Sequence, residues 1–264
     1  MSLRAACKTV QVSLSGHYYR PRCRSNDEVI EALNAVIERH PRWGFWKCFH
    51  RLRLDGRVWN HKRVHRIYCT LKLNLPRRTK HRMPSRIREQ LVVPHQINQV
   101  WSADFMADSL YGGRAFRTFN IIDDYHREAI AIEVDTSLPA TRLIRVFDQL
   151  KAWRTLPKRL RVDNGPEFTS AVFIGWAAQH GIEIRYIQPG NPNQNAFIER
   201  FNRSYREEVL NAYLFSSLDE VREITYEWLS DYNEKRPHNA LHQLPPVDYA
   251  RLNVPKNSPL TCST

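Results

Sequence analysis

The 264-residue sequence has no long apolar segment, few glycines and few cysteines. No run approaches the roughly 18 consecutive apolar residues of a membrane-spanning helix, which excludes an integral membrane protein. The N-terminus lacks the apolar segment and cleavage site of a secretory signal. The five cysteines are scattered and never spaced as CxxC, a pattern typical of reduced intracellular thiols rather than of a disulfide framework. We therefore expect a soluble, cytoplasmic protein.

Acidic residues are scarce in the first part of the chain. The whole sequence carries 40 Lys and Arg against 27 Asp and Glu, a net charge of +13. Residues 1–100 hold 21 basic and 6 acidic side chains, whereas residues 101–264 hold 19 and 21. A basic surplus indicates a polyanionic partner. Because the surplus lies in one part of the chain, that part is expected to contact nucleic acid or a membrane surface.

Residues 26–75 have the apolar spacing of three short helices. Asn26 can cap the first helix, and Pro41 ends it, because the residue before a proline resists helical dihedral angles. The second helix ends at Asp55-Gly56, and the third begins near Asn60. Two short helices, a turn that contains glycine and a third helix resemble a helix-turn-helix unit.

The third helix of this unit leaves a basic face pointing outward. An ordinary three-helix bundle with a solvated basic face would show the same pattern, but the local positive charge favours DNA binding. His61, His65 and Cys69 have the spacing of zinc ligands on one helical flank, yet no fourth ligand stands at a suitable distance. The predicted DNA contacts on this helix are Lys62, Arg63 and Arg66.

The second half of the chain has the pattern of an α/β domain. Residues 76–98 are basic and contain prolines but little periodicity, which indicates a linker. Short β-type runs follow, and they predict an antiparallel meander. Helical and strand patterns then alternate, which implies a mixed sheet covered by helices. The expected strands are 100–106, 116–122, 129–134, 159–162 and 183–187, and the expected helices lie around 143–150 and at 170–180, 194–213 and 218–231.

Three carboxylates occupy unusual places in this half. Asp104 lies inside the apolar strand QVWSADFM, where β-propensity disfavours an acid. Asp163 closes the run RLRVD directly before a turn signal, and Glu199 lies one turn into a helix. Each alone is more often structural or exposed than catalytic. Together, converging carboxylates need neutralising, and a divalent metal is the usual solution. Asp123 and Asp124 have the position of ordinary hairpin residues.

The helix that carries Glu199 has a polar side rich in amides and guanidinium groups. Residues three, four and seven apart share one side of a helix, so these groups lie near the carboxylate. Amides and guanidiniums suit phosphate oxygens, although a solvated helix face would look similar. The predicted DNA contacts here are Asn195, Asn202, Arg203 and Arg206.

The order Asp, Asp, Glu, with 35 residues between Asp163 and Glu199, resembles the DDE signature of polynucleotidyl transferases related to retroviral integrase. Longer motifs are similar to those of bacterial insertion-sequence transposases, in particular the catalytic second-frame protein (OrfB) of insertion sequence family three. The resemblance covers about residues 26–250, including the basic three-helix unit. These motifs are WSADF, VDNGPEF, QPGNPNQNAFIERFNRSYREEVLN and DYNEKRPHNALHQLPPVDY.

The resemblance implies an RNase H-like fold, with a mixed five-stranded sheet and flanking helices, preceded by the helix-turn-helix unit. Asp104 would lie on the first strand, Asp163 at the end of the fourth, and Glu199 on a helix beside them. These three residues would be catalytic and would bind two Mg²⁺ ions, for which Mn²⁺ can substitute. Arg206 stands where the wider group usually has a basic residue, often lysine. Glu167 has no ligand role in the family pattern.

The resemblance further implies a transposase that cleaves and joins DNA by in-line attack of water or a 3′-hydroxyl on phosphodiesters. It would bind element ends and target DNA, and it would form a homo-oligomer on DNA. A first-frame (OrfA) protein would be a partner or a fused segment, and no membrane contact is expected. The expected location is the bacterial cytoplasm, associated with the nucleoid when bound. A plain nuclease, a non-catalytic DNA-binding regulator and an inactive fragment of a mobile element are the alternatives.

The expected division of the chain follows the change in composition near residue 99. The first segment is an extension without an assigned role, and the last is a tail. The expected segments are an extension at 1–25, a DNA-binding unit at 26–75, a linker at 76–98, a catalytic core at 99–250 and a tail at 251–264.

Overall fold

The computed structural model describes residues 2–18, 25–76, 93–187 and 195–253 of the chain. Two short helices come first, α1 (Leu3–Thr9) and α2 (Leu14–Tyr18), which the apolar pattern does not predict. Within the described ranges no helix combines the length and the apolar character needed to cross a bilayer.

The three helices expected in the basic segment are present as α3 (Asp27–Arg39), α4 (Phe45–Leu54) and α5 (His61–Thr70). Their apolar faces share one small core that includes the buried Val29, Leu33, Phe49 and Val64.

The caps of these helices agree only in part with the sequence. Asn60 caps α5, since its side chain accepts the N–H of Lys62 at 2.8 Å. The expected cap at Asn26 is wrong, because its backbone is not extended and its side chain makes no cap hydrogen bond. The Asn26 side-chain oxygen instead accepts from Arg63 Nε at 3.2 Å, which ties α5 to the start of α3.

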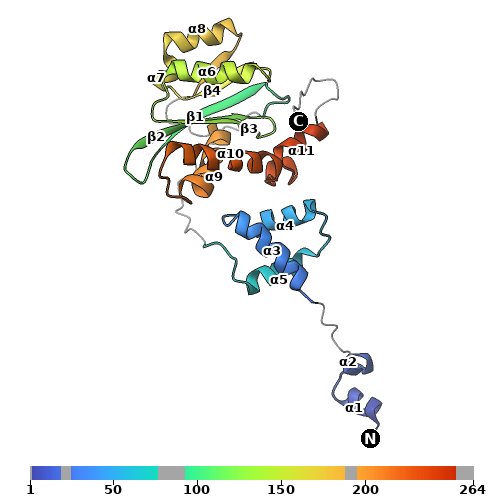
Figure 1. The fold of residues 1–264 in the computed structure, drawn as a ribbon. Coiled ribbons are helices and arrows are strands. Elements are labelled where there is room, and N and C mark those ends of the chain that lie inside the picture. The colour runs from blue at the N-terminus through green and yellow to red at the C-terminus, as the bar shows by residue number, and fades with distance from the viewer. Residues whose placement is uncertain (1, 19–24, 77–92, 188–194, 254–264) are drawn as a thin grey trace, which may run out of the picture.

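A five-stranded mixed sheet forms the centre of the second unit, as expected (Figure 1). The strand order is β3-β2-β1-β4-β5. The first three strands form the predicted antiparallel meander, and β4 and β5 run parallel to β1 because helices connect them. The strands are β1 (Val100–Ser109), β2 (Ala115–Asp123), β3 (Ala129–Asp135), β4 (Arg159–Val162) and β5 (Glu183–Tyr186).

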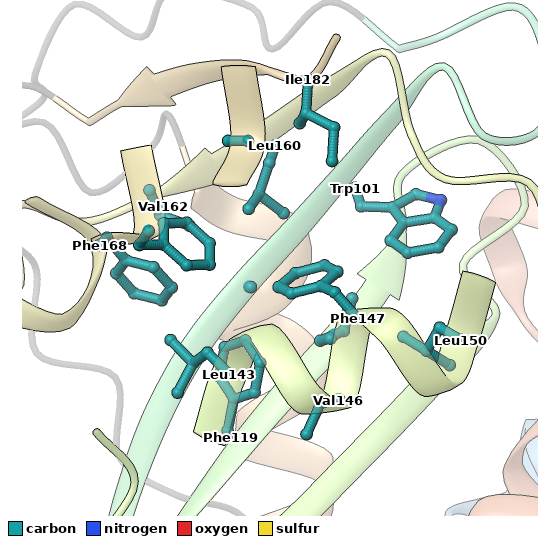
Figure 2. Packing of buried hydrophobic residues seen from close by; sticks show 14 of the residues in the cluster. Trp101, Phe119, Leu143, Val146, Phe147, Leu150, Leu160, Val162, Phe168 and Ile182 are labelled. Atoms are coloured by element: carbon teal, nitrogen blue, oxygen red, sulfur yellow. The ribbon is translucent and has the colours of Figure 1, made fainter. Parts of the chain in front are cut away.

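Three helices cover one face of the sheet, namely α6 (Ala140–Lys151), α7 (Pro166–Thr169) and α8 (Ala171–Gln179) (Figure 1). The main core fills the space between them and the strands. Figure 2 shows Phe147 of α6 between Trp101 and Phe119 of the sheet, and all three side chains are fully buried. Burial of these aromatic side chains stabilises the packing of α6 on the sheet.

The opposite face is covered by α9 (Ala196–Tyr205) and α10 (Leu218–Glu234), with α11 (Pro246–Asn253) beside α10 (Figure 1). The single helix expected at 194–213 is wrong in its second part, because α9 gives way to a π-helical turn, Arg206–Leu210. Periodicity of 3.6 residues cannot reveal such a turn. The helix α11 is also absent from the expected elements.

Polar contacts join the three-helix unit to α10. Arg39 donates from Nε and Nη2 to the carboxylate of Asp231 at 3.0 and 3.2 Å. Arg51 Nη1 donates to the carbonyl oxygen of Lys235 at 3.3 Å. These contacts place the basic helices on the α10 side of the sheet rather than on the α6 side (Figure 1).

We expect Phe147→Ala to lower the free energy of unfolding by about 3–5 kcal/mol, because it leaves a cavity in the main core. Phe147→Leu should cost less, since it keeps most of the buried volume. Urea unfolding followed by circular dichroism measures both. The exposed Gln149→Ala on the same helix is the control. A loss under about 1 kcal/mol for Phe147→Ala would contradict this assignment of the core.

Candidate active site on the sheet

The parallel pairing of β1 with β4 brings two of the predicted carboxylates together. Ser102 pairs with Arg161 in this ladder. Carrying the same register two residues further places Asp104 next to Asp163, which directly follows β4. The ladder is set by backbone hydrogen bonds and by the main core, so the approach of the two acids does not depend on attraction between them.

Asp104 lies half-buried on the face of β1 that α9 covers. Its carboxylate accepts the N–H of Phe105 at 2.8 Å and Nδ2 of Asn202 at 2.8 Å. Burial, together with the negative charges of Asp163 and Glu199, raises the pKa of Asp104 to about 6 against the opposing effect of the two hydrogen bonds. Asp163 and Glu199 therefore both lie within electrostatic range of Asp104.

The carboxylate of Asp163 packs closely against Gly165, two residues further along the chain. Its Oδ1 accepts the N–H of Gly165 at 3.0 Å. A Cβ atom at position 165 would stand 2.9 Å from that oxygen and 3.2 Å from Oε2 of Glu167, so a side chain there would displace both carboxylates. Glu167 is paired with Arg117, whose Nη1 lies 2.5 Å from Oε1. The carboxylate of Glu167 is therefore already neutralised by Arg117.

Glu199 lies in the first turn of α9 and its side chain is exposed. Among the described residues, no three His, Cys, Asp or Glu side chains stand close enough together to form a group that could hold a metal ion. The structure thus places the predicted acids on β1, directly after β4 and on α9, without the close convergence of a complete ligand set.

Two amides predicted to contact DNA are buried instead of sharing an outward polar side. Asn202 is 8% exposed, and Asn195 is 3% exposed. Asn202 donates to Asp104 and accepts from Nδ2 of Asn120 on β2 at 2.7 Å. The helical spacing alone could not show that α9 turns this side toward the sheet, where Asn120 and Asp104 are paired across the ladder.

The predicted guanidinium groups of this helix have different surroundings. Arg203 is exposed. Arg206 donates from Nη1 to Asp108 at 3.1 Å and from Nη2 to the carbonyl oxygen of Ala107 at 2.9 Å, which fastens the end of α9 to β1. Arg206 is thus already paired with β1, although 38% of its side chain remains exposed.

The basic face of α5 is also only partly free. Lys62 and Arg66 are exposed. Arg63 donates to the carbonyl oxygen of Ser25 at 2.7 Å as well as to Asn26, so it holds the helices together.

The acids between β2 and β3 are not ordinary hairpin residues. Asp123 and Asp124 are fully buried. Asp124 accepts from Ser102 Oγ at 2.7 Å and pairs with Arg161 at 2.8 Å. The sequence contains one signal of this burial, namely two successive acids directly at the end of a buried strand. Buried acids need partners such as Arg161, whereas solvent-exposed hairpin residues do not. Sequence reasoning also missed Asn120, which has no motif of its own.

We expect Asp104→Asn to stabilise the metal-free protein at neutral pH. The raised pKa means that the folded state holds a proton that the unfolded state releases near pH 4. Stability from this group is therefore present below about pH 4 and is lost as the pH rises through about 6. Urea unfolding in EDTA should show the variant about 1–3 kcal/mol more stable at pH 7.5 and equal to wild type near pH 3.5.

The matched control for this substitution is Glu223→Gln on the exposed side of α10. It removes one negative charge without a buried partner, and we expect its effect to be under about 0.5 kcal/mol at both pH values. Equal free energies of unfolding for Asp104→Asn and wild type at pH 7.5 would show that the charged form of Asp104 is not disfavoured in the folded protein.

Comparisons with known proteins agree with this arrangement. Models of the integrase core domain match residues 94–192 and 180–246, and a model of an HTH-like domain matches residues 24–81. A protein of insertion element IS407 from Burkholderia multivorans is 38% identical over 95% of this chain and 91% of its own length. The transposase of insertion sequence element IS904 from Lactococcus lactis is 24% identical over 84% of this chain and 93% of its own length.

A solved structure shares the fold. The intasome of simian T-cell lymphotropic virus, determined in complex with a PP2A regulatory subunit, contains a chain that aligns with a TM-score of 0.52 and 16% identity. The alignment covers 88% of this chain and 78% of that one. The mixed sheet and its two helical layers therefore have an integrase-like architecture, and the helical unit that precedes them is HTH-like. Together with the matches above, they show that this chain belongs to the insertion-sequence transposases that carry an integrase core domain.

Proposed function

We propose that the protein cleaves DNA at the ends of an insertion sequence and joins the freed 3′-hydroxyl to a target, with Asp104, Asp163 and Glu199 as its catalytic residues. Membership in the family supports DNA transposition as the process and polynucleotidyl transfer as the type of reaction. The observation that carries the choice of residues is the register that sets Asp104 beside Asp163, with both Asp163 and Glu199 acting on the pKa of Asp104.

The donor atoms of the three carboxylates are of the hard, oxygen kind that Mg²⁺ prefers. Burial disfavours the charged form of Asp104, and a cation would restore it. No His or Cys belongs to the proposed set, so Mg²⁺, or Mn²⁺ in its place, suits it better than zinc. We propose two ions; when bound, such ions activate the attacking oxygen and stabilise the leaving one in an in-line displacement.

The chain's own residues supply the orientation. Asn202 donates to Oδ2 of Asp104 and the N–H of Phe105 donates to Oδ1, and these two hydrogen bonds orient the carboxylate. Gly165, which has no side chain, leaves room for the carboxylates of Asp163 and Glu167 beside it. Arg203 on α9, with Lys62 and Arg66 on α5, offers exposed cations for the phosphate backbone.

We propose the following division of labour. Residues 26–75 bind DNA, 76–98 link the two units, and 99–250 form the catalytic core. Residues 188–194 of that core, and most of the linker, lie outside the described residues. Assembly of a homo-oligomer on DNA, partnership with a first-frame protein, and location in the bacterial cytoplasm with association to the nucleoid remain predictions from the family resemblance.

We expect Asp163→Asn to reduce DNA cleavage and strand transfer by about 100-fold or more, because a metal-ligand carboxylate supplies several kcal/mol of transition-state stabilisation. DNA affinity should stay within about threefold, since the phosphate contacts lie on other residues. Linear DNA carrying the element ends is incubated with Mg²⁺, products are separated on a gel, and fluorescence anisotropy gives affinity. Glu223→Gln is the control.

Each alternative has its own outcome in this assay. Undiminished joining by Asp163→Asn would overturn the catalytic assignment. Cleavage by wild type without joined products would indicate a plain nuclease. DNA binding by wild type without either product would indicate a non-catalytic regulator or an inactive fragment.

We expect Asn202→Ala to raise the Mg²⁺ concentration for half-maximal cleavage by about tenfold, because a group that orients a metal ligand is worth roughly 10–100-fold in affinity or activity. The same change leaves Nδ2 of Asn120 without its acceptor and should lower stability by about 1–3 kcal/mol. A Mg²⁺ titration and urea unfolding measure the two effects. Asn211→Ala, exposed after the π-helical turn, should change neither.

A further inference from the structure

The turn between β2 and β3 contains a residue held in an unusual backbone conformation. Arg127 has φ of +61°, in the left-handed region that residues other than glycine rarely adopt. Its N–H donates to the carbonyl oxygen of Asp123 at 3.0 Å, which closes the turn. Such conformations persist where the surroundings fix them, and they concentrate at functional sites.

The side chain of Arg127 reaches from this turn to α9. Its guanidinium carbon lies 3.4 Å from the centre of the Phe197 ring. Nη1 also donates to the carbonyl oxygen of Asp124. The planar group therefore lies against the ring with one edge fixed by the backbone, a geometry that arginine provides and lysine does not.

Hydrogen bonds of Asp123 and Asp124 fix the turn to neighbouring parts of the chain. Asp123 accepts the N–H of Asn98 and the N–H of Tyr125, both at 2.7 Å. Asp124 is bonded to Ser102 and Arg161 on the neighbouring strands. The backbone of Arg127 is thus anchored to the sheet through this turn, so its guanidinium group is held in a fixed position against Phe197.

The beginning of α9 is held by side-chain packing rather than by a side-chain cap. The residue before the helix, Asn195, makes no side-chain cap hydrogen bond. In the first turn, Ile198 is buried against Ile122 and Ala129, whereas Phe197 is only partly buried. Glu199 follows in the same turn. Fixing the Phe197 ring therefore limits rotation and fraying of the turn that carries the carboxylate.

We propose that Arg127 is a positioning residue that fixes Glu199 by stacking on Phe197. The inference rests on the proposed catalytic role of Glu199. The contacts of Arg127 are with Phe197 and with the Asp124 backbone rather than with the three proposed catalytic carboxylates, so it acts through the ring two residues before Glu199. The arrangement links the sheet that bears Asp104 to the helix that bears the third carboxylate at a second place, separate from Asn202.

The first test measures the helix and does not require activity. Hydrogen exchange followed by mass spectrometry is recorded for peptides of α9 and of α6 in metal-free wild type, Arg127→Ala, Arg127→Lys and Arg145→Ala. Arg145 is an exposed arginine of α6 and controls for the lost charge. We expect Arg127→Ala to speed exchange in α9 by about tenfold or more with α6 unchanged, and Arg127→Lys to restore little of the protection. Wild-type exchange in α9 of Arg127→Ala would overturn the proposal.

The second test connects the contact to the carboxylate. We expect Arg127→Ala to raise the Mg²⁺ concentration for half-maximal cleavage by about tenfold while DNA affinity stays unchanged. Phe197→Leu should do the same and should leave little for Arg127→Ala to add, because both changes remove one contact. Phe197→Leu also leaves the turn intact, so it tests the contact if Arg127→Ala loosens the whole sheet.

The outcomes separate the two proposals. If wild type shows no metal-dependent cleavage, the proposed function fails, whatever the exchange data show. If wild type is active and Glu199→Gln is not, but Arg127→Ala and Phe197→Leu match Arg145→Ala in their Mg²⁺ dependence, only the role of Arg127 is overturned. Additive effects of Arg127→Ala and Phe197→Leu would also overturn it.

Discussion

The parallel ladder between β1 and β4 is the constraint on which the proposed site depends. Two carboxylates side by side repel each other, and a half-buried one is disfavoured again by its loss of solvent. Their approach persists because Trp101, Leu160 and Val162 are fully buried on the other face of the same strands. The apolar core thus stabilises an arrangement that is electrostatically unfavourable, and the raised pKa of Asp104 is the visible result.

Polar contacts then fix the second half of α9 and the turn after it to β1. Asn202 reaches Asp104, and Arg206 reaches Asp108 four residues further along β1. Residues four apart lie on the same face of a strand and on neighbouring turns of a helix. The helix is therefore aligned with the strand at two points, so the position of Glu199 follows from the position of β1. Arg127 would add a third point from the β2–β3 turn.

Much of this fold could be predicted from the sequence, because its elements differ in period. Alternation over two residues located all five strands, and the strand at 159–162 has the predicted bounds. The triad came from the resemblance of long motifs. The contacts of Asn202 and the burial of Asp124 could not be predicted, since both depend on which side a helix or turn faces after folding. Pairing between distant residues, such as Arg127 with Phe197, leaves no local pattern to read.

The π-helical turn after α9 limits how many residues can connect α9 to α10. A regular α-helix advances about 100° per residue, so one extra residue in a turn rotates everything after it by about that angle. Here the rotation brings Glu208 inward, where it accepts from Trp228 Nε1 at 3.0 Å and pairs with Arg236. Deleting one residue between Tyr205 and Asn211 would restore an ordinary helix and turn this acid away from both partners. The number of residues that connect the Glu199 helix to α10 therefore cannot change by one without loss of these contacts, even though no side chain of the turn takes part in the chemistry.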